Sequence, residues 1–142
     1  MMNKLVFAFI LAVVCVPVTL ASPDTETSGA DDLVVRIAEI EVFPEWLDAY
    51  LAAAKTVGAE SVAKEPGVVC IFPMRQKENP CSIRIVEIYR SEAAYKTHLL
   101  TPHFRAYKEG TPHMIKSLKL VPMTPLDAEG MKLIFRKEGA NR

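Results

Sequence analysis

Two histidines, His98 and His103, lie on either side of a Thr101-Pro102 step and are the residues of this chain best suited to proton transfer. Imidazole has an unperturbed pKa of about 6.5, so it can take up and release a proton near neutral pH. On an unbroken helix, at about 100° per residue, two side chains five positions apart would point about 140° away from each other. Pro102 interrupts such a helix because it lacks an N–H, and a threonine followed by proline is a typical helix start. The break therefore allows both imidazoles to face one cavity.

A carboxylate and a phenol precede the two histidines, at the end of a run with strand-like alternation. In this run one face carries Ile83, Ile85, Glu87 and Tyr89. A carboxylate on an aliphatic face must find a partner or be protonated, because burying an unpaired charge is costly. We therefore expect Glu87 to fix the orientation of an imidazole and Tyr89 to hydrogen-bond a substrate oxygen.

The same residues also allow an interpretation without chemistry. His103 would then be an exposed residue in the first turn of a helix, and Glu87 would pair with Arg84 or Arg105. His113 follows a second Thr-Pro step just before the last strand-like run, and we interpret it as a loop residue.

Metal and cofactor signatures are missing from the sequence. The histidine spacings match neither the helical i, i+4 pair nor a Cys/His zinc pattern, so we expect no metal. The chain has no Gly-rich phosphate loop, nucleophile elbow or dinucleotide fingerprint.

Hydrophobic periodicity and helix signals predict the elements that must position these residues. We expect strands at 33–42, 68–74, 82–89 and 115–121, a long helix from Pro44 to Lys64, and short helices at 91–100 and 102–110. Pro73 cannot donate to a sheet ladder, which predicts that its strand lies at an edge. The order β-α-β-β-α-β is typical of a ferredoxin-like α+β sandwich. One face of such a sheet needs a cover, and a second copy of the chain is the simplest one, so we expect a homodimer.

The first 21 residues are typical of a cleaved secretory signal peptide. A positive Met1–Lys4 segment precedes the apolar run Leu5–Val16, and small residues at Thr19 and Ala21 mark a cleavage site. We expect a disordered leader at 22–32, one domain at 33–122 and a tail at 123–142. The protein would then be periplasmic or secreted, with no membrane segment after cleavage. A formal net charge of zero gives no indication of nucleic-acid binding.

Two cysteines, Cys70 and Cys81, follow the predicted leader. A secretory compartment permits a disulfide between them, but the turn between their strands does not place them directly opposite each other. Two buried thiols are the alternative.

The run from Glu87 to Phe104 resembles the antibiotic biosynthesis monooxygenase superfamily. In that family a strand-end Glu-x-(Trp/Tyr) is followed by Ala and then by His-x-x-Thr-Pro-His, as in 98–103 here, and Glu65-x-Gly67 is also similar. The resemblance covers about 33–121. It implies a dimeric α/β barrel with one cavity per subunit between the sheet and the helices.

Members of that family include cofactor-free oxygenases of quinols, an isomerase of a phosphorylated signal and haem-degrading enzymes. The first strand here has no Asn, and Tyr89 stands where a Trp would be, which disfavours the haem-degrading branch. A phosphorylated substrate is unusual outside the cytoplasm. The resemblance therefore favours a small quinol or phenolic substrate.

We predict a cofactor-independent monooxygenase in which His98 or His103 is the base and Glu87 orients it. Substrate contacts are expected from Tyr89 and from three further aromatic residues, which are Tyr95, Phe104 and Trp46, although a lone Trp on an amphipathic helix is commonly part of the core. Two alternatives stay open: a proton-transfer isomerase of the same fold, and a dimer that binds a small ligand without turning it over.

Overall fold

The computed structural model of the chain describes residues 32–131 and 133. The predicted signal peptide, the predicted leader except Asp32, and most of the tail beyond Met131 lie outside the described residues. Within them, no helix is both long and apolar enough to cross a membrane.

Among the described residues, four strands and three α-helices follow one another in the predicted order, and a further short helical segment lies at 128–131. The strands are β1 (Val34–Val42), β2 (Val68–Arg75), β3 (Ser82–Tyr89) and β4 (Ile115–Met123), and the helices are α1 (Leu47–Lys64), α2 (Glu92–His98) and α3 (Pro102–Gly110). Short 3₁₀ turns at Pro44–Trp46 and Pro112–Met114 precede α1 and β4. The sequence-based boundaries therefore differ from the observed ones by only a few residues, except at the first helix, which begins with a 3₁₀ turn.

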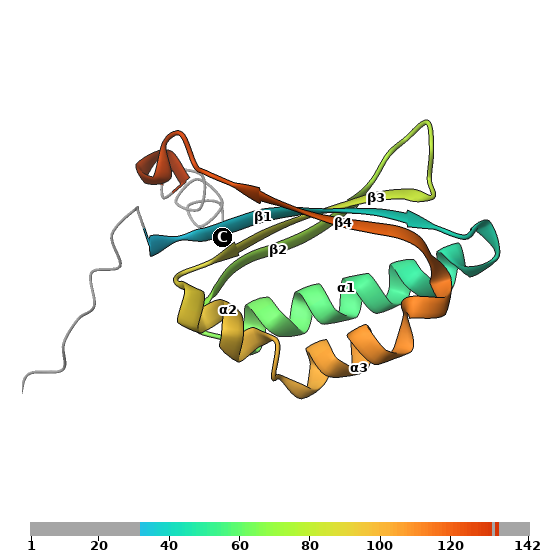
Figure 1. Ribbon diagram of the computed structural model, residues 1–142, viewed down its shortest axis with the longest axis horizontal. Coiled ribbons are helices and arrows are strands. Elements are labelled where there is room, and N and C mark those ends of the chain that lie inside the picture. The colour runs from blue at the N-terminus through green and yellow to red at the C-terminus, as the bar shows by residue number, and fades with distance from the viewer. Residues whose placement is uncertain (1–31, 132, 134–142) are drawn as a thin grey trace, which may run out of the picture.

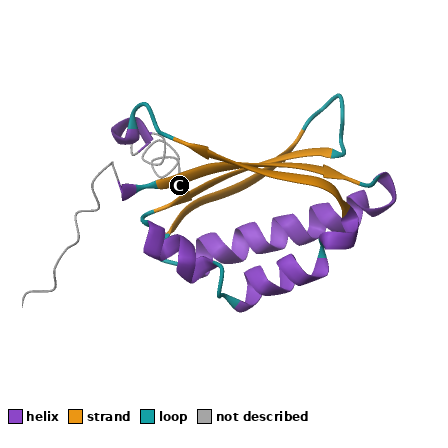
Figure 2. Cartoon of the chain, in the orientation of Figure 1, coloured by secondary structure: helices purple, strands orange, loops and turns teal. Residues whose placement is uncertain are grey.

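All strands pair antiparallel in the order β2-β3-β1-β4, and the three helices cover one face of the sheet (Figures 1 and 2). This confirms the ferredoxin-like α+β sandwich. β1 is central, as its two apolar faces predict, and β2 is an edge strand, as Pro73 predicts.

The core lies between α1 and the middle of the sheet. Its fully buried side chains include Tyr50 and Ala54 of α1 and, from the sheet, Ile40, Val42 and Ile83. Burial of these apolar side chains against the helix is the main stabilising term for the domain. The cavity described below begins where this packing ends, beside α2 and α3.

Two local predictions have clear outcomes. Cys70 and Cys81 are both free thiols, and both are partly exposed rather than buried as the alternative expected. Ser91 caps α2 by accepting a hydrogen bond from the Ala94 amide at 3.1 Å, whereas the Thr101 hydroxyl does not cap α3 and instead donates to the His98 carbonyl at 2.8 Å.

The sheet face opposite the helices carries an apolar patch, which we name the outer patch. It consists of side chains that alternate with the inward-facing ones: Val35, Ile37, Phe72, Val86, Ile88 and Val121. None of α1, α2 and α3 covers it (Figure 1), and Phe72 is 57% exposed.

Candidate active site

Strand alternation brings charged and aliphatic side chains together on the inner face of the sheet. Arg36 of β1 is directly opposite Glu87 of β3 in the strand register, and Ala38 is opposite Ile85 in the next inward pair. Cross-strand neighbours lie within reach of each other's side chains. The inner face therefore has one polar end, formed by the Arg36–Glu87 pair, and an apolar middle.

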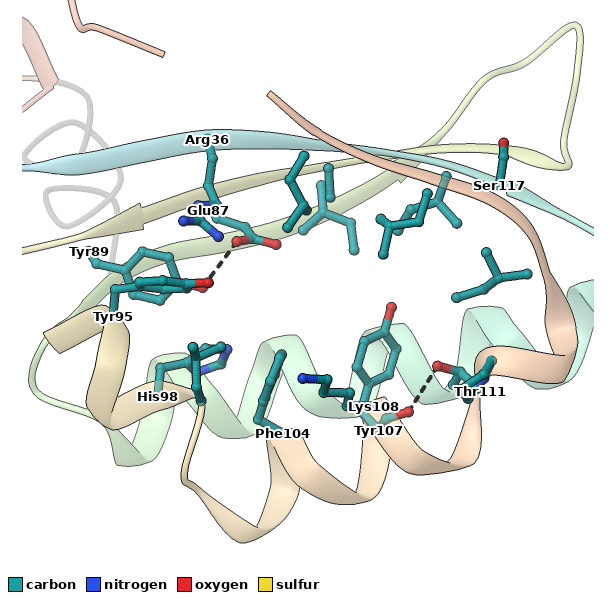
Figure 3. Close-up of a pocket in the computed structure, with 18 of the residues that line it drawn as sticks. Arg36, Glu87, Tyr89, Tyr95, His98, Phe104, Tyr107, Lys108, Thr111 and Ser117 are labelled. Atoms are coloured by element: carbon teal, nitrogen blue, oxygen red, sulfur yellow. Dashed lines mark hydrogen bonds between the residues drawn. The ribbon is translucent and has the colours of Figure 1, made fainter. Parts of the chain in front are cut away.

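A cavity of about 560 Å³ separates this inner face from α2 and α3 (Figure 3). This size is in the range of small-molecule sites. The surface of the lining is mostly apolar. Its aromatic residues are Tyr89, Tyr95, Phe104 and Tyr107, and its other residues with polar side chains are Arg36, Glu87, His98, Lys108, Thr111, Lys116 and Ser117. Leu118 and Leu120 of β4 also line the cavity yet are about half exposed, so the cavity opens along β4.

The polar end of the cavity is a connected group of four side chains. The Tyr89 hydroxyl donates to Glu87 Oε2 at 3.1 Å, and the Arg36 guanidinium lies 3.9 Å above the centre of the Tyr95 ring. Burial raises the pKa of the Glu87 carboxyl, against the opposing effects of the Tyr89 hydrogen bond and the Arg36 charge. Burial also raises the pKa of Tyr89 above its ordinary value, which keeps the phenol protonated as a donor.

The floor of the cavity carries His98, whose ring packs 4.4 Å from Phe104 and 5.3 Å from Tyr89 between ring centres. His98 Nδ1 lies 3.0 Å from Glu65 Oε1, and His103 Nε2 lies 2.6 Å from the same oxygen. Glu65 is positioned by the end of α1, and the Pro102 break starts α3 so that His103 reaches the same carboxylate.

These three side chains are well shielded from water, with exposed fractions of 3% for His98, 9% for Glu65 and 11% for His103. Burial lowers the pKa of His98, although the hydrogen bond and the charge of Glu65 act in the opposite direction. Burial alone would raise the pKa of Glu65, but hydrogen bonds from His103 and His98 outweigh it and lower that pKa. The geometry therefore describes a neutral His98 that donates its Nδ1–H to an ionised Glu65.

Fixing the proton on Nδ1 determines what the other ring nitrogen can do. Nε2 of His98 takes no part in the bond to Glu65, and the ring lines the cavity. In this tautomer Nε2 carries a lone pair, so it can accept a proton from a bound molecule.

Two expectations about this group are wrong. Glu87 does not orient an imidazole: it bonds Tyr89, and Glu65 holds both histidines. His103 does not line the cavity described above: its ring, bonded to Glu65, borders a second, more open pocket with Glu60 and Lys64. The structure also differs from two contacts expected in the interpretation without chemistry: His103 is shielded, and Arg84 lies near Glu39 and Glu41 of β1.

Three of the four aromatic residues predicted to contact a substrate line the cavity, and one does not. Tyr89, Tyr95 and Phe104 all line the cavity, and their predicted contact with a substrate stays a prediction. Trp46 does not line it: the ring is 40% exposed and packs edge-on against His113 at 4.7 Å, so it belongs to neither the cavity nor the core. Trp46 is the last residue of the 3₁₀ turn that precedes α1.

Three functional candidates were missed by sequence reasoning. Glu65 lies 33 residues before His98, and only its place in the Glu-x-Gly element of the family resemblance marked it. Arg36 could have been found from the strand alternation, as it shares a face with Ala38 and Ile40. Lys108 gave no signal, because an exposed face of a short helix is ordinarily rich in lysine.

Comparisons with known proteins agree with this geometry. The family model for antibiotic biosynthesis monooxygenase matches residues 33–110. A crystal structure from Bacteriodes thetaiotaomicron, described as a candidate member of the same group, is 44% identical, with a TM-score of 0.68 over 70% of this chain and 94% of that one. The chain belongs to the antibiotic biosynthesis monooxygenase family.

More distant relatives of this family member were also found. A structure from Lactobacillus acidophilus, described as a candidate monooxygenase, is 30% identical with a TM-score of 0.63, covering 65% of this chain and 44% of that one. An uncharacterised protein of Synechocystis is 28% identical over 90 residues, which are 63% of this chain and 60% of the relative. The chain thus spans less than two thirds of the length of the Synechocystis relative.

Proposed function

We propose that this family member is a cofactor-independent monooxygenase that oxidises a small phenol or quinol, with His98 as the general base. The observation that carries the proposal is the buried His98, whose Nδ1 is held by ionised Glu65 at 3.0 Å while its ring lines an apolar cavity. A base with a fixed tautomer and a pKa below the working pH is ready to accept a proton.

The proposed reaction begins when Nε2 of His98 removes the phenolic proton. The resulting phenolate is electron-rich and transfers electrons to O₂, and one oxygen atom forms a bond to the ring while the other leaves as water. For a simple phenol, one phenol and one O₂ give one quinone and one water, so atoms and electrons balance without a further reductant. Glu65 stabilises the imidazolium that forms in the first step, as a carboxylate does for a catalytic histidine.

The charges around the cavity support a phenolate intermediate. Lys108 of α3 and Lys116 of β4 line the cavity, and neither side chain forms an ion pair or hydrogen bond with any described residue. Figure 3 shows the Lys108 side chain beside Phe104 and Tyr107. Cationic groups near a phenol favour its ionised form, so these lysines would assist the proton transfer to His98.

The experiment is oxygen consumption by the purified protein with a panel of phenols and hydroquinones, repeated under ¹⁸O₂. We expect oxygen uptake above buffer and one labelled oxygen atom in the quinone product. His98→Ala should lower the rate by about a hundredfold or more, the scale of a lost general base. His113→Ala is the matched control, because this histidine packs on Trp46 away from the cavity, and it should keep the wild-type rate.

Two results would contradict the oxygenase. A panel compound that raises the melting temperature without any turnover would favour the ligand-binding alternative. Conversion of a compound to an isomer without oxygen uptake would favour the proton-transfer isomerase, which needs the same base.

We also propose that the chain is a homodimer that joins through the outer patch. The patch is an apolar area on a sheet face that none of α1, α2 and α3 covers (Figure 1). Exposed apolar areas of this kind mark association surfaces. A monomer in light scattering at micromolar concentration would contradict this proposal.

Export to the periplasm or the medium is a further proposal, which rests on the signal-like sequence of the first 21 residues. N-terminal sequencing of the protein recovered from outside the cytoplasm should begin at Ser22. Recovery of uncleaved chain only from the cytoplasm would contradict it.

A further inference from the structure

The Glu65, His98 and His103 side chains offer a second chemistry besides proton transfer. One carboxylate oxygen and one nitrogen from each ring lie within 4.8 Å of one another. They come from three places in the chain: the residue after α1, the last residue of α2 and the second residue of α3. Imidazole nitrogens with a carboxylate oxygen are a ligand set typical of zinc and related transition metals.

The two distances that join Glu65 to the imidazoles are close to those of a metal site. Zinc bonds of about 2.0–2.1 Å at tetrahedral angles place neighbouring ligand atoms about 3.3 Å apart. Glu65 Oε1 lies 3.0 Å from His98 Nδ1 and 2.6 Å from His103 Nε2. Side-chain adjustments of well under 1 Å at these two contacts would therefore open room for an ion in place of the two bridging protons.

The surroundings supply an outer carboxylate and a route from solvent. Glu60 Oε2 lies 4.0 Å from His103 Nδ1, the ring nitrogen that faces away from Glu65. A carboxylate that hydrogen-bonds the second nitrogen of a histidine ligand raises its basicity and fixes its tautomer, and Glu60 would take this role by moving about 1 Å closer. The shallow pocket lined by Glu60, Glu65 and His103 borders the group, so an ion has access and a water molecule can complete its coordination.

We propose that Glu65, His98 and His103 bind a divalent transition metal of the zinc type, with His98 as ligand through Nδ1 and His103 through Nε2. Glu60 supports the site through the second nitrogen of His103. The expectation of no metal rested on sequence spacing, which cannot register a carboxylate 33 residues away from the first histidine.

Metal binding would change what His98 offers to the cavity. A metal on Nδ1 of a neutral imidazole requires its proton to be on Nε2, so the nitrogen that is not bonded to Glu65 becomes a donor in place of an acceptor. This consequence rests on the proposed function: if His98 is the base of the oxygenase, a bound metal inhibits the enzyme.

The binding test uses the tag-free full chain, stripped with a chelator and dialysed. Zn²⁺ is titrated by calorimetry, and Co²⁺ by its visible d–d absorption, whose intensity reports low-symmetry coordination by nitrogen and oxygen. We expect one ion per chain. His103→Gln and Glu65→Gln should each weaken binding by about a hundredfold or more, and Glu60→Gln by about tenfold, the scale of an outer-shell loss.

His113→Ala is the matched control, because it removes the one remaining histidine of the chain and leaves the group intact. It should bind Zn²⁺ as the wild type does. Melting curves identify any variant that is not folded, and because His103 is at the start of α3 with an 11% exposed side chain, His103→Gln is the variant best suited to stay folded. Absence of binding in the wild type, or equal binding by the wild type and folded His103→Gln, would overturn the proposal.

Oxygen uptake in the presence of Zn²⁺ separates this inference from the proposed function. If both hold, Zn²⁺ inhibits the wild-type oxidation at the concentration at which it binds, and a chelator restores the rate. Binding of Zn²⁺ by a chain with no oxidation of any panel compound supports the metal site and contradicts the oxygenase. Oxidation that continues unchanged with the site occupied overturns the tautomer argument and with it the role of His98 as base.

Discussion

At the scale of single residues, the two ring nitrogens of His98 have different roles. Nδ1 donates to Glu65, so the lone pair is on Nε2, and the ring lines the cavity. The sequence indicated His98 and His103 as a pair, because the Thr101-Pro102 break makes their meeting geometrically feasible. It assigned the wrong carboxylate, since alternation along β3 shows that Glu87 faces inward but cannot show that Glu65, after a different helix, lies closer to the imidazoles.

Replacement of Glu65 by Gln tests the orienting carboxylate. The rate of oxidation should fall by about ten- to a hundredfold, because the imidazolium loses its counter-charge while the amide keeps a hydrogen bond. Glu65 also acts to raise the pKa of His98, so the acid limb of the pH profile of kcat/KM should move to lower pH. A profile with unchanged position and height would contradict this role.

The acid limb of the wild type should itself reflect the burial of His98. Burial lowers the pKa of this imidazole, so the neutral base persists below the ordinary histidine value of about 6.5. The value of kcat/KM should rise with pH to a plateau, and the midpoint of this rise should lie below that value. A midpoint above it would show that another group titrates, or that His98 is held in its charged form.

At the scale of elements, Gly67, the residue before β2, packs against Ala94 of α2, the helix that carries Tyr95 and His98. A Cβ atom on Gly67 would lie 2.5 Å from the Ala94 Cβ, closer than two carbon atoms that are not bonded to each other can approach. The family-like Glu65-x-Gly67 element therefore has a packing reason for its glycine, which the sequence alone did not reveal.

Gly67→Ala should destabilise the fold by about 1–3 kcal/mol, the usual cost of overpacking, as measured by urea unfolding. Ala94→Gly in the same chain removes the atom that clashes. The double variant should therefore lose less unfolding free energy than the sum of the losses in the two single variants. A loss in the double variant equal to that sum would contradict the steric account.

The cap of α2 is a second element-level test. Ser91 accepts the Ala94 amide hydrogen bond at 3.1 Å, so Ser91→Ala should cost about 1 kcal/mol of unfolding free energy. Ser91→Asp, which keeps a cap acceptor, should retain most of the stability. Equal losses in the two variants would show that the hydroxyl does not act as a cap.

At the scale of the whole molecule, the order of elements and the face assignments could be predicted because hydrophobic periodicity reports which side of each element is buried. β1 with two apolar faces is central, and β2 with Pro73 is at the edge, as expected. Side-chain partners between elements distant in the chain could not be predicted, because they depend on how α1 ends and α3 begins. Trp46 illustrates this, since a 3₁₀ turn before α1 leaves it packed on His113.

The outer patch makes a prediction about assembly. Phe72 is 57% exposed and is part of the patch, so Phe72→Glu should convert the proposed dimer to a monomer in light scattering. Trp46→Glu, at a site of 40% exposure away from the patch, is the matched control and should leave the mass unchanged. If Phe72→Glu has the same mass as the wild-type dimer, the chain does not associate through this face.

The central claim is that His98 is the base of an oxygenase, and rescue of His98→Ala by free imidazole tests it most directly. Removal of the ring leaves a space beside Glu65 that imidazole fits, so we predict a rate reduced by about a hundredfold or more. Added imidazole should restore the rate of His98→Ala in proportion to the concentration of neutral imidazole. It should have no effect on the rate of His113→Ala. A folded His98→Ala protein that oxidises its substrate at the wild-type rate, or that imidazole does not restore, would contradict the claim.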